Sequence, residues 1–314
     1  HQHDIARMNA ALYRADEALI LPKVEGLDVL ATILQEIKAN RIDVVMIGSE
    51  FDLEFFAINR LQIEKETGAL VIAAPIETVA LADDKWLTAE FLRKNGFPYG
   101  EAYLPSGLDD ALSRAKAWGY PVVLKPRRGT SSRDVYIVKN SAMMTDCFAS
   151  TPLPMLQRVI ENPSSELGRE FTCSVFKTPD GQIVGPFTAR RTVKGGTSWH
   201  VEVAPFDELN DLLLLLGESV PFIGSLNVQL MLTKDGPVPF ELNSRFSGTT
   251  AVRAHFGFNE PEMALRACFY GEKLAQPVIG TGIAMRYHEE VFIESATAET
   301  LEPGLSRGKV NPWF

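Results

Sequence analysis

Three polar side chains stand at alternate positions in the segment FELNSRFSG, residues 240–248. Glu241, Asn243 and Arg245 follow an apolar run, and residues two apart in a strand point to the same face. A carboxylate, an amide and a guanidinium would then share one face, while Leu242 would point to the other. Two interpretations are open at this point: a solvent-exposed strand face, or a site for a metal ion and a phosphate group.

A turn signal, KDGP at residues 234–237, joins this strand to the preceding apolar run SLNVQLMLT. Such a turn between two strands predicts an antiparallel hairpin. If the turn centres on Asp235, Gln229 lies opposite Glu241, with their Cβ atoms about 5 Å apart. Gln229, Glu241 and Asn243 would then offer only oxygen ligands, which suit Mg²⁺ when phosphate and water complete its shell. The polar outer face of a half-exposed hairpin is the alternative.

A loop rich in cations follows the apolar segment PVVLKP, residues 121–126. Glycine lets backbone N–H groups approach an anion closely, and nearby hydroxyl groups add donors. The loop therefore predicts a local anion site, with a solvated basic hairpin loop as the alternative. Neither GxxxxGK[ST] nor GxGxxG occurs in the chain, so this is not a Walker A or a dinucleotide motif. The residues concerned are Lys125, Arg127, Arg128, Gly129, Thr130, Ser131, Ser132 and Arg133.

Further charged groups lie on the strands that follow. Glu170 heads REFTCSVFK, and a carboxylate there could accept from the paired hydroxyls of a ribose, while the preceding hinge offers backbone groups to a purine edge. An exposed glutamate at the start of a strand is the alternative. Arg190, Arg191 and Lys194, with Arg253 further on, could bind a phosphoryl group or an acidic substrate, or could be solvated edge charges.

The composition excludes several classes of protein. The chain has 314 residues, 46% of them hydrophobic, and a net charge of −9, so no overall basic field attracts nucleic acid or an anionic membrane. No apolar run is long enough to span a bilayer, and three widely spaced cysteines make no disulfide framework. We therefore expect a cytoplasmic protein. Because the chain lacks an initiator Met and soon reaches a strand, we also expect native residues before His1, with a processed or tagged start as the alternative.

The elements that must position these side chains change in character along the chain. From Ala18 to about Asp83, short apolar strands alternate with amphipathic helices, which predicts a parallel α/β sheet. One helix is expected over LADDKWLTAEFLRKNG, with acidic residues in its first turn. After Gly100 the pattern is rich in strands, which predicts an α+β region. Helices are expected there near residues 107–118, 141–149, 206–218 and 260–271.

Taken together and in this order, the motifs resemble those of the ATP-grasp superfamily, and most closely its carbamoyl-phosphate-synthase-large-subunit-like branch. The likeness rests on Lys85, Lys125 with its loop, QRVIE leading to Glu170, Gln229 in NVQ, and ELNSRFSG. It implies two α+β subdomains that grip ATP, preceded by a parallel α/β domain that would be incomplete at its N-terminus. The expected domains are 1–83 (pre-ATP-grasp), 84–158 (N-terminal subdomain with the lid) and 159–314 (C-terminal subdomain with the metal site).

The resemblance implies a nucleotide site built from lysines and a glycine loop. Lys85 and Lys125 would contact the ATP phosphates, and the segment from about 118 to 158 would close as a lid. Residues 157–160 would line the adenine pocket, and Glu170 would bind the ribose. The full set implied for ATP is Lys85, Lys125, Arg128, Gly129, Thr130, Ser131, Gln157, Arg158, Val159, Ile160, Glu170 and Gln229.

The resemblance also assigns the metal and the catalytic charges. Gln229, Glu241 and Asn243 would hold one or two Mg²⁺ ions, for which Mn²⁺ could substitute. Arg245, with Lys125 and Arg191, would stabilise the charge on the transferred phosphoryl group. Many relatives have proline where this chain has Ser244, a change that keeps the strand spacing.

The implied reaction is an ATP-dependent ligation. A carboxylate attacks the γ-phosphate to give an acylphosphate, and an amine or ammonia then displaces phosphate; the partners are small molecules, with a homodimer as one compatible assembly. Positioning and charge neutralisation carry such chemistry, which fits a chain without an evident nucleophile. Two alternatives stay open: phosphorylation of bicarbonate or carbamate as in carbamoyl phosphate synthases, and a non-catalytic nucleotide-binding subunit.

Overall fold

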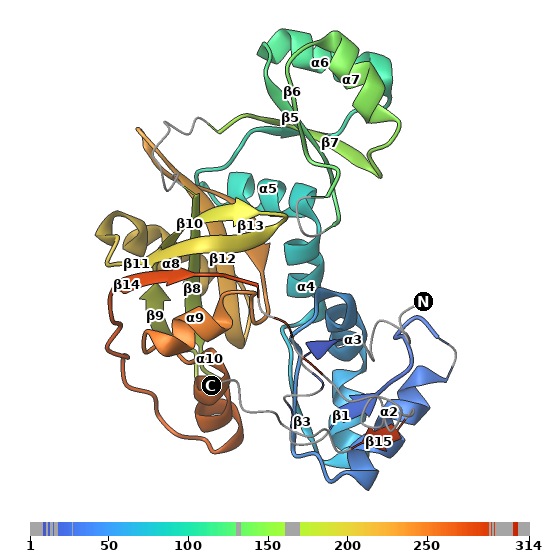
Figure 1. Cartoon of the computed structure of the whole chain (residues 1–314), viewed down its shortest axis with the longest axis vertical. Coiled ribbons are helices and arrows are strands. Elements are labelled where there is room, and N and C mark those ends of the chain that lie inside the picture. The colour runs from blue at the N-terminus through green and yellow to red at the C-terminus, as the bar shows by residue number, and fades with distance from the viewer. Residues whose placement is uncertain are drawn as a thin grey trace. The chain divides into compact units, whose positions relative to one another are not determined.

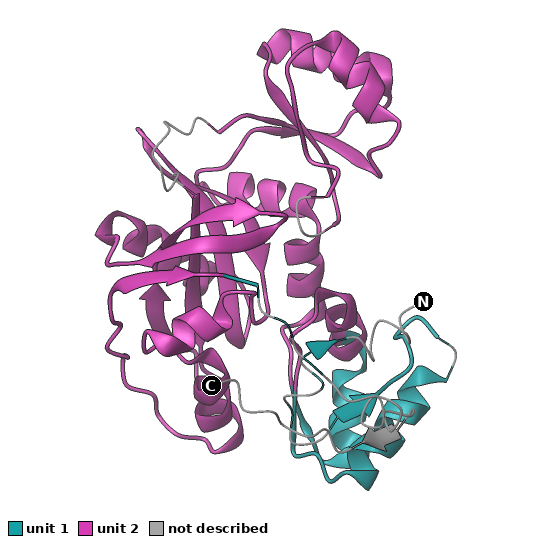
Figure 2. Cartoon of the chain, in the orientation of Figure 1, with its two compact units in different colours: residues 1–45, 58–71, 287–314 teal, residues 46–57, 72–286 magenta. Residues whose placement is uncertain are grey.

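The computed structural model describes residues 9–10, 12, 15, 18–26, 28–129, 133–160, 170–288, 290 and 292, and the backbone of 304–306. The chain divides into two compact units (Figure 2). The smaller comprises residues 1–45, 58–71 and 287–314, and the larger comprises residues 46–57 and 72–286. These units divide the chain differently from the three domains expected from the sequence, and that three-domain assignment stays a prediction.

The N-terminal region contains the expected parallel pairing. Strands β2 (Val44–Met46) and β3 (Leu70–Ile72) form a two-stranded parallel sheet, and helix α3 (Glu50–Thr67) connects them. Helix α2 (Val29–Ala39) buries Val29, Ile33, Leu34 and Ile37, an apolar stripe at helical spacing. The strand expected at residues 18–21 has a different partner, because β1 (Ala18–Ile20) pairs antiparallel with β15 (Gly304–Ser306).

The single helix expected over residues 81–96 is in fact two helices. Helix α4 (Ile76–Asp83) ends before Asp84, whose backbone is extended, and α5 (Lys85–Lys94) begins after it. The Asp84 carboxylate accepts from the backbone N–H groups of Trp86 and Leu87, so it is the N-cap of α5. The acidic residue therefore caps the second helix and does not lie in its first turn.

A small four-stranded sheet with two helices forms one part of the larger unit (Figure 1). Its strand order is β4 (Ala102–Tyr103), β7 (Pro154–Arg158), β5 (Val122–Pro126), β6 (Tyr136–Val138). Helices α6 (Leu108–Trp118) and α7 (Ser141–Phe148) match the expected helices and pack on this sheet. Their shared core contains Ala111, Ala115, Val122, Leu124, Val138, Met144 and Leu156.

The other part of the larger unit is an antiparallel seven-stranded sheet. Its order is β13 (Gly236–Asn243), β12 (Gly224–Thr233), β8 (Glu170–Lys177), β10 (Ala189–Lys194), β11 (Thr197–Val203), β14 (Gly282–Met285), with β9 (Ile183–Phe187) also paired to β8. The accompanying helical segments are η2 (Asp207–Leu209), α8 (Asn210–Ser219), α9 (Thr250–His255), α10 (Glu260–Ala264) and a π-helical turn, η3 (Leu265–Phe269). The strand expected over IVGPFTARRTV is two strands, β9 and β10, separated at Thr188.

The β12–β13 hairpin places Gln229 opposite Glu241, which confirms the expected register. The turn is centred between Lys234 and Asp235 and not on Asp235 as expected, because Thr233 pairs with Gly236 and Met231 with Val238. An irregularity after Gln229 leaves Phe240 as the extra residue on β13. Without this bulge Gln229 would face Phe240, and Glu241 would point to the opposite face of the sheet.

We expect Asp84→Ala to lower the free energy of unfolding by about 2 kcal/mol. The change removes the cap of α5 and leaves Arg127, now 2.5 Å from the Asp84 carboxylate, without its ion pair. Urea denaturation monitored by circular dichroism would measure the change. Glu90→Ala is the matched control, because it removes the exposed pair with Arg93 and should cost less than about 1 kcal/mol. Equal effects of the two substitutions would contradict the capping role.

Candidate functional site

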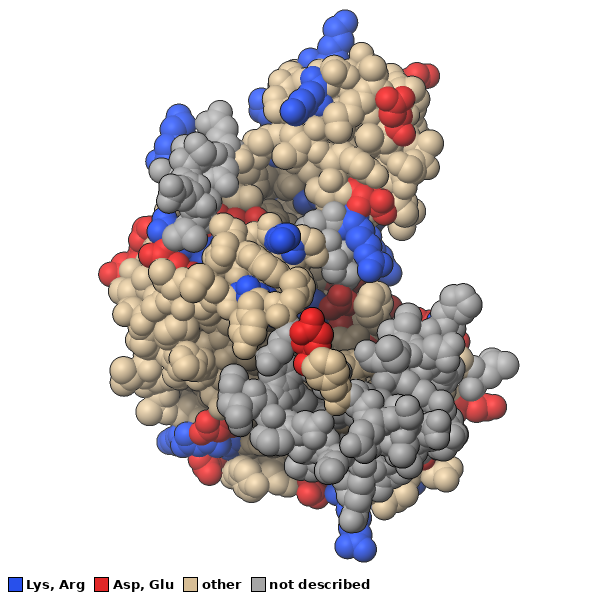
Figure 3. Space-filling view, in the orientation of Figure 1, with Lys and Arg blue, Asp and Glu red and all other residues tan. Residues whose placement is uncertain are grey.

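A pocket of about 510 Å³ lies in the larger unit, and all of its lining residues belong to that unit. Lys and Arg side chains stand beside Asp and Glu at the hollow in the middle of the face shown in Figure 3. The polar lining comes from the start of α3, the α4–α5 junction, the cation-rich loop, strands β8, β10, β11, β12 and β13, and the segment that follows β13. Its charged members are Glu50, Glu54, Asp83, Lys85, Arg128, Arg191, Glu241 and Arg245.

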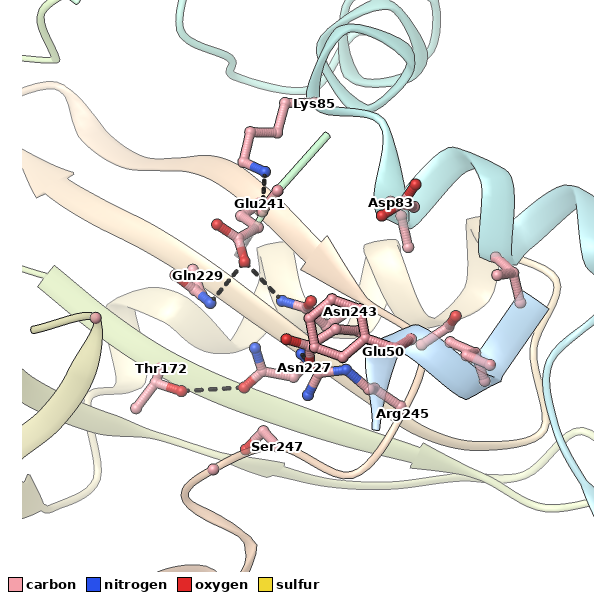
Figure 4. Close-up of a pocket in the computed structure, with 18 of the residues that line it drawn as sticks. Glu50, Asp83, Lys85, Thr172, Asn227, Gln229, Glu241, Asn243, Arg245 and Ser247 are labelled. Atoms are coloured by element: carbon pink, nitrogen blue, oxygen red, sulfur yellow. Dashed lines mark hydrogen bonds and ion pairs between the residues drawn. The ribbon is translucent and has the colours of Figure 1, made fainter. Parts of the chain in front are cut away.

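Glu241 lies between two amides on neighbouring positions of the hairpin (Figure 4). Its Oε1 atom accepts from Gln229 Nε2 and from Asn243 Nδ2, each at 3.0 Å. The structure thus brings together the three residues that the sequence predicted as metal ligands. No group of three or more His, Cys, Asp or Glu residues suited to a metal ion occurs in the described part of the chain. A cation at this site would therefore depend on the amide oxygens as well as on Glu241.

Lys85, the first residue of α5, is hydrogen-bonded to the cation-rich loop. Its Nζ atom donates to the Gly129 carbonyl at 2.7 Å, and its backbone N–H donates to the Arg127 carbonyl at 2.9 Å. Arg128 forms an ion pair with Asp83 at 3.4 Å. Burial is the main reason that the pKa of Asp83 is raised above its ordinary value. Of the loop residues predicted from the sequence, Thr130, Ser131 and Ser132 lie outside the described residues.

Lys125 is buried on the small sheet, opposite the strand that carries Gln157. Its Nζ atom donates to Gln157 Oε1 at 2.7 Å, and Gln157 Nε2 donates to the Gly100 carbonyl at 3.1 Å. The pKa of Lys125 is lowered to about 8. Burial is the main cause, the charge of Lys85 acts in the same direction, and Glu241 opposes the shift. The amine is thus held by an uncharged partner, and its ionised form would gain from a nearby anion.

Arg191, on β10, donates hydrogen bonds to residues on three other strands of the large sheet. Its Nη2 atom donates to Glu170 Oε1 at 2.6 Å and to Gln229 Oε1 at 2.8 Å, and its Nη1 atom donates to Ser198 at 2.9 Å. Glu170, which the sequence predicts to bind ribose, is therefore the ion-pair partner of Arg191. Through Gln229 this pair is continuous with Glu241.

Arg245 also lines the pocket, where it forms an ion pair with Glu50 at 2.7 Å. Glu50 is the first residue of α3, and it was not predicted as a site residue because an acidic residue in the first turn of a helix is common.

Two other lining residues were not predicted, although the alternation of side chains along the strands marks them. Asn227 stands two residues before Gln229, and Thr172 two residues after Glu170.

The remaining predicted cations lie away from the described lining of this pocket. Arg190 pairs with Glu202 at 2.5 Å, Lys194 lies 4.7 Å from the ring of Trp199, and Arg158 pairs with Glu101. Arg253 is fully buried against Glu260, so it is not an exposed contact for an acidic substrate. Val159 and Ile160 follow β7 and are partly buried.

We expect Gly100→Ala to destabilise the protein by about 1–3 kcal/mol through overpacking. A Cβ atom at Gly100 would lie 2.4 Å from Gln157 Nε2 and 2.9 Å from its Cδ, so the partner of Lys125 would have to move. Thermal unfolding monitored by calorimetry would measure the effect. Gly48→Ala is the control, because a Cβ there also meets nothing within 4 Å. A variant Gly100→Ala as stable as the control would contradict the close packing.

A protein-family model described as an ATP-grasp domain matches residues 82–249, just over half of the chain. Solved structures show the same fold. The biotin carboxylase domain dimer of Hydrogenobacter thermophilus 2-oxoglutarate carboxylase, in complex with MgADP, ADP and bicarbonate, is similar with a TM-score of 0.68 and 17% identity, over 85% of this chain and 62% of that one. Campylobacter jejuni biotin carboxylase in complex with β,γ-ATP gives a TM-score of 0.70 and 17% identity, over 83% and 64%.

N5-carboxyaminoimidazole ribonucleotide synthetase from Thermotoga maritima gives a TM-score of 0.59 and 21% identity, over 78% of this chain and 63% of that one. The chain thus spans less than two thirds of the length of these three proteins. The carbamoyl-phosphate-synthase-like branch named from the sequence is a finer assignment and stays a prediction. The matched region contains the α4–α5 junction, the cation-rich loop, Glu170, Gln229 and the ELNSRFSG segment. The chain therefore belongs to the ATP-grasp family.

Proposed function

We propose that the protein is a Mg-ATP-dependent ligase that activates a carboxylate as an acylphosphate and joins it to an amine or ammonia. The observation that carries the proposal is the placement of Glu241, with two amides, in the same pocket as Lys85, Arg191 and Arg245. This pocket combines oxygen ligands for a cation with positive side chains for phosphate oxygens. Complexes of the similar structures with ATP or ADP support the proposal.

The nucleotide would lie between the small sheet and the large sheet of the larger unit. Lys85, Lys125, Arg128 and the Gly129 loop, with Thr130 and Ser131, would bind its phosphates. Residues 157–160 would contact the adenine, and Glu170 the ribose. Because Glu170 pairs with Arg191, it can accept from ribose hydroxyl groups only with its remaining lone pairs or after Arg191 turns toward phosphate. Lid closure over residues 118–158 is part of the same proposal.

The residues present fit a Mg²⁺ ion, with Mn²⁺ as a substitute. Gln229 and Asn243 now direct their amide nitrogens to Glu241, so rotation of each amide would turn its oxygen toward a cation. Arg191, which donates to Gln229 Oε1, would release that oxygen in the process. Bound there, the ion would neutralise phosphate charge during the transfer.

Arg245 and Arg191 would act on the reacting groups as fixed charges. Each is held by a carboxylate, Glu50 or Glu170, which restricts the side chain before any ligand arrives. A cation oriented in this way stabilises developing negative charge with little reorganisation. No step in the proposed reaction requires a protein nucleophile.

Two alternatives make different predictions for turnover. The bicarbonate in the Hydrogenobacter thermophilus complex favours phosphorylation of bicarbonate as the second candidate. A non-catalytic nucleotide-binding subunit is the third, and the complete set of Gln229, Glu241, Asn243 and Arg245 argues against it. The same complex is a dimer, which supports a homodimer here.

A cytoplasmic location is also proposed. All three cysteines are free thiols, as expected in a reducing compartment. Among the described residues, no helix has the length and apolar character required to cross a membrane.

We expect Glu241→Gln to lower kcat at least about 100-fold without unfolding the protein, because the only carboxylate among the proposed metal ligands is lost. Release of ADP and phosphate would be measured with Mg-ATP against a panel of carboxylates, each with and without amines. Glu90→Gln, on the exposed face of α5, is the control and should keep the wild-type rate. Turnover with bicarbonate alone would favour the second candidate, and an active Glu241→Gln enzyme would exclude the site assignment.

We expect the affinity for MgADP to fall about tenfold between pH 7.5 and 9.5, where the nucleotide phosphates are already ionised. The pKa of Lys125 is about 8, so the amine loses its proton across this range. Calorimetric titration should show this fall for the wild type and for Lys116→Met, which removes an exposed lysine. Lys125→Met should bind weakly with little pH dependence, and a variant that keeps the wild-type profile would refute the role.

The same pKa has a consequence for stability without ligand. The unfolded chain has the ordinary lysine pKa of 10.5, so it binds more protons than the folded chain between about pH 8 and 10.5. The contribution of Lys125 to the free energy of unfolding therefore increases with pH across this window, and Lys125→Met should remove that increase.

A further inference from the structure

A fully buried ion pair lies behind the pocket floor, in a part of the larger unit that the proposed chemistry does not use. Arg253 of α9 and Glu260 of α10 are both 0% exposed, and Arg253 Nη1 donates to both Glu260 carboxylate oxygens at 3.1 Å. Removing two charges from water is costly, and apolar residues of similar volume often stabilise a core equally well. Arg253 Nε even lacks a hydrogen-bond partner among the described residues. Stability alone is therefore a weak reason for this pair.

The second nitrogen of Arg253 reaches the residues that line the pocket. Arg253 Nη2 donates to Asn227 Oδ1, to Thr172 Oγ1 at 3.3 Å and to the Cys173 carbonyl at 3.3 Å. Thr172 Oγ1 also donates to Asn227 Oδ1 at 3.0 Å. Two donors thus converge on one amide oxygen, and a flip of the amide would place its NH₂ group against both of them.

The hydrogen bonds from Thr172 and Arg253 therefore set the orientation of the Asn227 amide. With Oδ1 directed to Thr172 and Arg253, Nδ2 is turned to the opposite side, toward the part of the pocket that holds Gln229 and Glu241 (Figure 4). Asn227 also lies directly across the hairpin from Asn243. An amide N–H₂ group at this place is a donor suited to an anionic oxygen.

Glu260 fixes the position of the Arg253 guanidinium. Its Oε1 atom accepts from Ser174 at 2.5 Å and from Ser225, and its Oε2 atom accepts from Thr250 at 3.3 Å. With the two bonds from Arg253 Nη1, the carboxylate accepts five hydrogen bonds from four donor groups. A carboxylate bound in this way fixes the guanidinium, so Arg253 cannot turn away from Asn227 without breaking the network.

We propose that Arg253 is a positioning residue that, together with Glu260, orients Asn227 so that its Nδ2 group donates to an anionic oxygen of the reacting carboxylate or of the transferred phosphoryl group. The proposal rests on the proposed ligase function for the identity of that oxygen. The network itself does not depend on which of the two anions is bound. Asn227 is the residue that touches the ligand, and Arg253 acts only through it.

A double-mutant cycle tests this coupling with kcat/KM as the readout. The variant Arg253→Gln/Glu260→Gln replaces the ion pair by neutral amides, which avoids leaving one charge buried alone. We expect it to lower kcat/KM about 10- to 100-fold, as for a lost hydrogen bond to a charged group, and Asn227→Ala to do the same. The variant with all three substitutions should have a kcat/KM no lower than that of Asn227→Ala alone. Effects that multiply, or wild-type kcat/KM in either variant, would overturn the proposal.

The Michaelis constants identify the anion. A rise in KM confined to the carboxylate would assign the oxygen to that substrate, whereas a fall in kcat at unchanged KM values would assign it to the phosphoryl group in transfer. Ser225→Ala is the matched control, because it removes one donor to Glu260 and leaves the Arg253–Asn227 bonds in place. It should lower the unfolding temperature while kcat/KM stays within about twofold.

A second measurement separates this proposal from the proposed function. In protein labelled with ¹⁵N-asparagine, the Asn227 side-chain resonance is identified by its absence in Asn227→Ala. We expect it to shift on titration with inorganic phosphate in the presence of MgADP, and the shift to be reduced in Arg253→Gln/Glu260→Gln. No shift in the wild type would overturn the donor role of Asn227. Absence of turnover with every substrate pair would overturn the ligase function instead, and leave this result standing.

Discussion

The pairing of Gln229 with Glu241 across β12 and β13 is the constraint on which the candidate site depends. Side chains alternate between the two faces of a strand, so a shift of one residue would exchange every pocket-facing group on β13 for a core-facing one. The extra residue at Phe240 restores the pairing that the turn alone would miss. Once Glu241 faces Gln229, a hydrogen-bonded series extends from Asn243 through Glu241 and Gln229 to Arg191.

Three cations with little exposure lie in the larger unit, and each is held by amide or carboxylate oxygens. Lys125 donates to the amide of Gln157, Arg191 to the carboxylate of Glu170, and Arg253 to Glu260 and Asn227. Burial of charge opposes folding, and these bonds offset part of that cost. The same bonds restrict the side chains before a ligand binds, which reduces the reorganisation needed when phosphate charge arrives.

Local pattern predicted most elements correctly, and its errors have physical causes. The helices α6 and α7 and the β12–β13 hairpin are where periodicity and turn residues place them. The break at Asp84 was missed because a helical pattern continues through it, and only the extended backbone and its capping bonds reveal the second helix. The burial of Arg253 was also not predicted, because a lone arginine on a short helix gives no signal of complete burial.

The sequence by itself determined the fold family and the set of polar groups on the hairpin, because strand alternation and the order of the motifs are local properties of the chain. Only the tertiary structure decided the partners of those groups. Arg191 meets Glu170, and Arg245 meets Glu50, because strands and a helix far apart in the sequence converge on one pocket. The orientation of Asn227 likewise depends on Arg253 and Thr172, since an amide has two different ends and only its neighbours select which one faces the ligand.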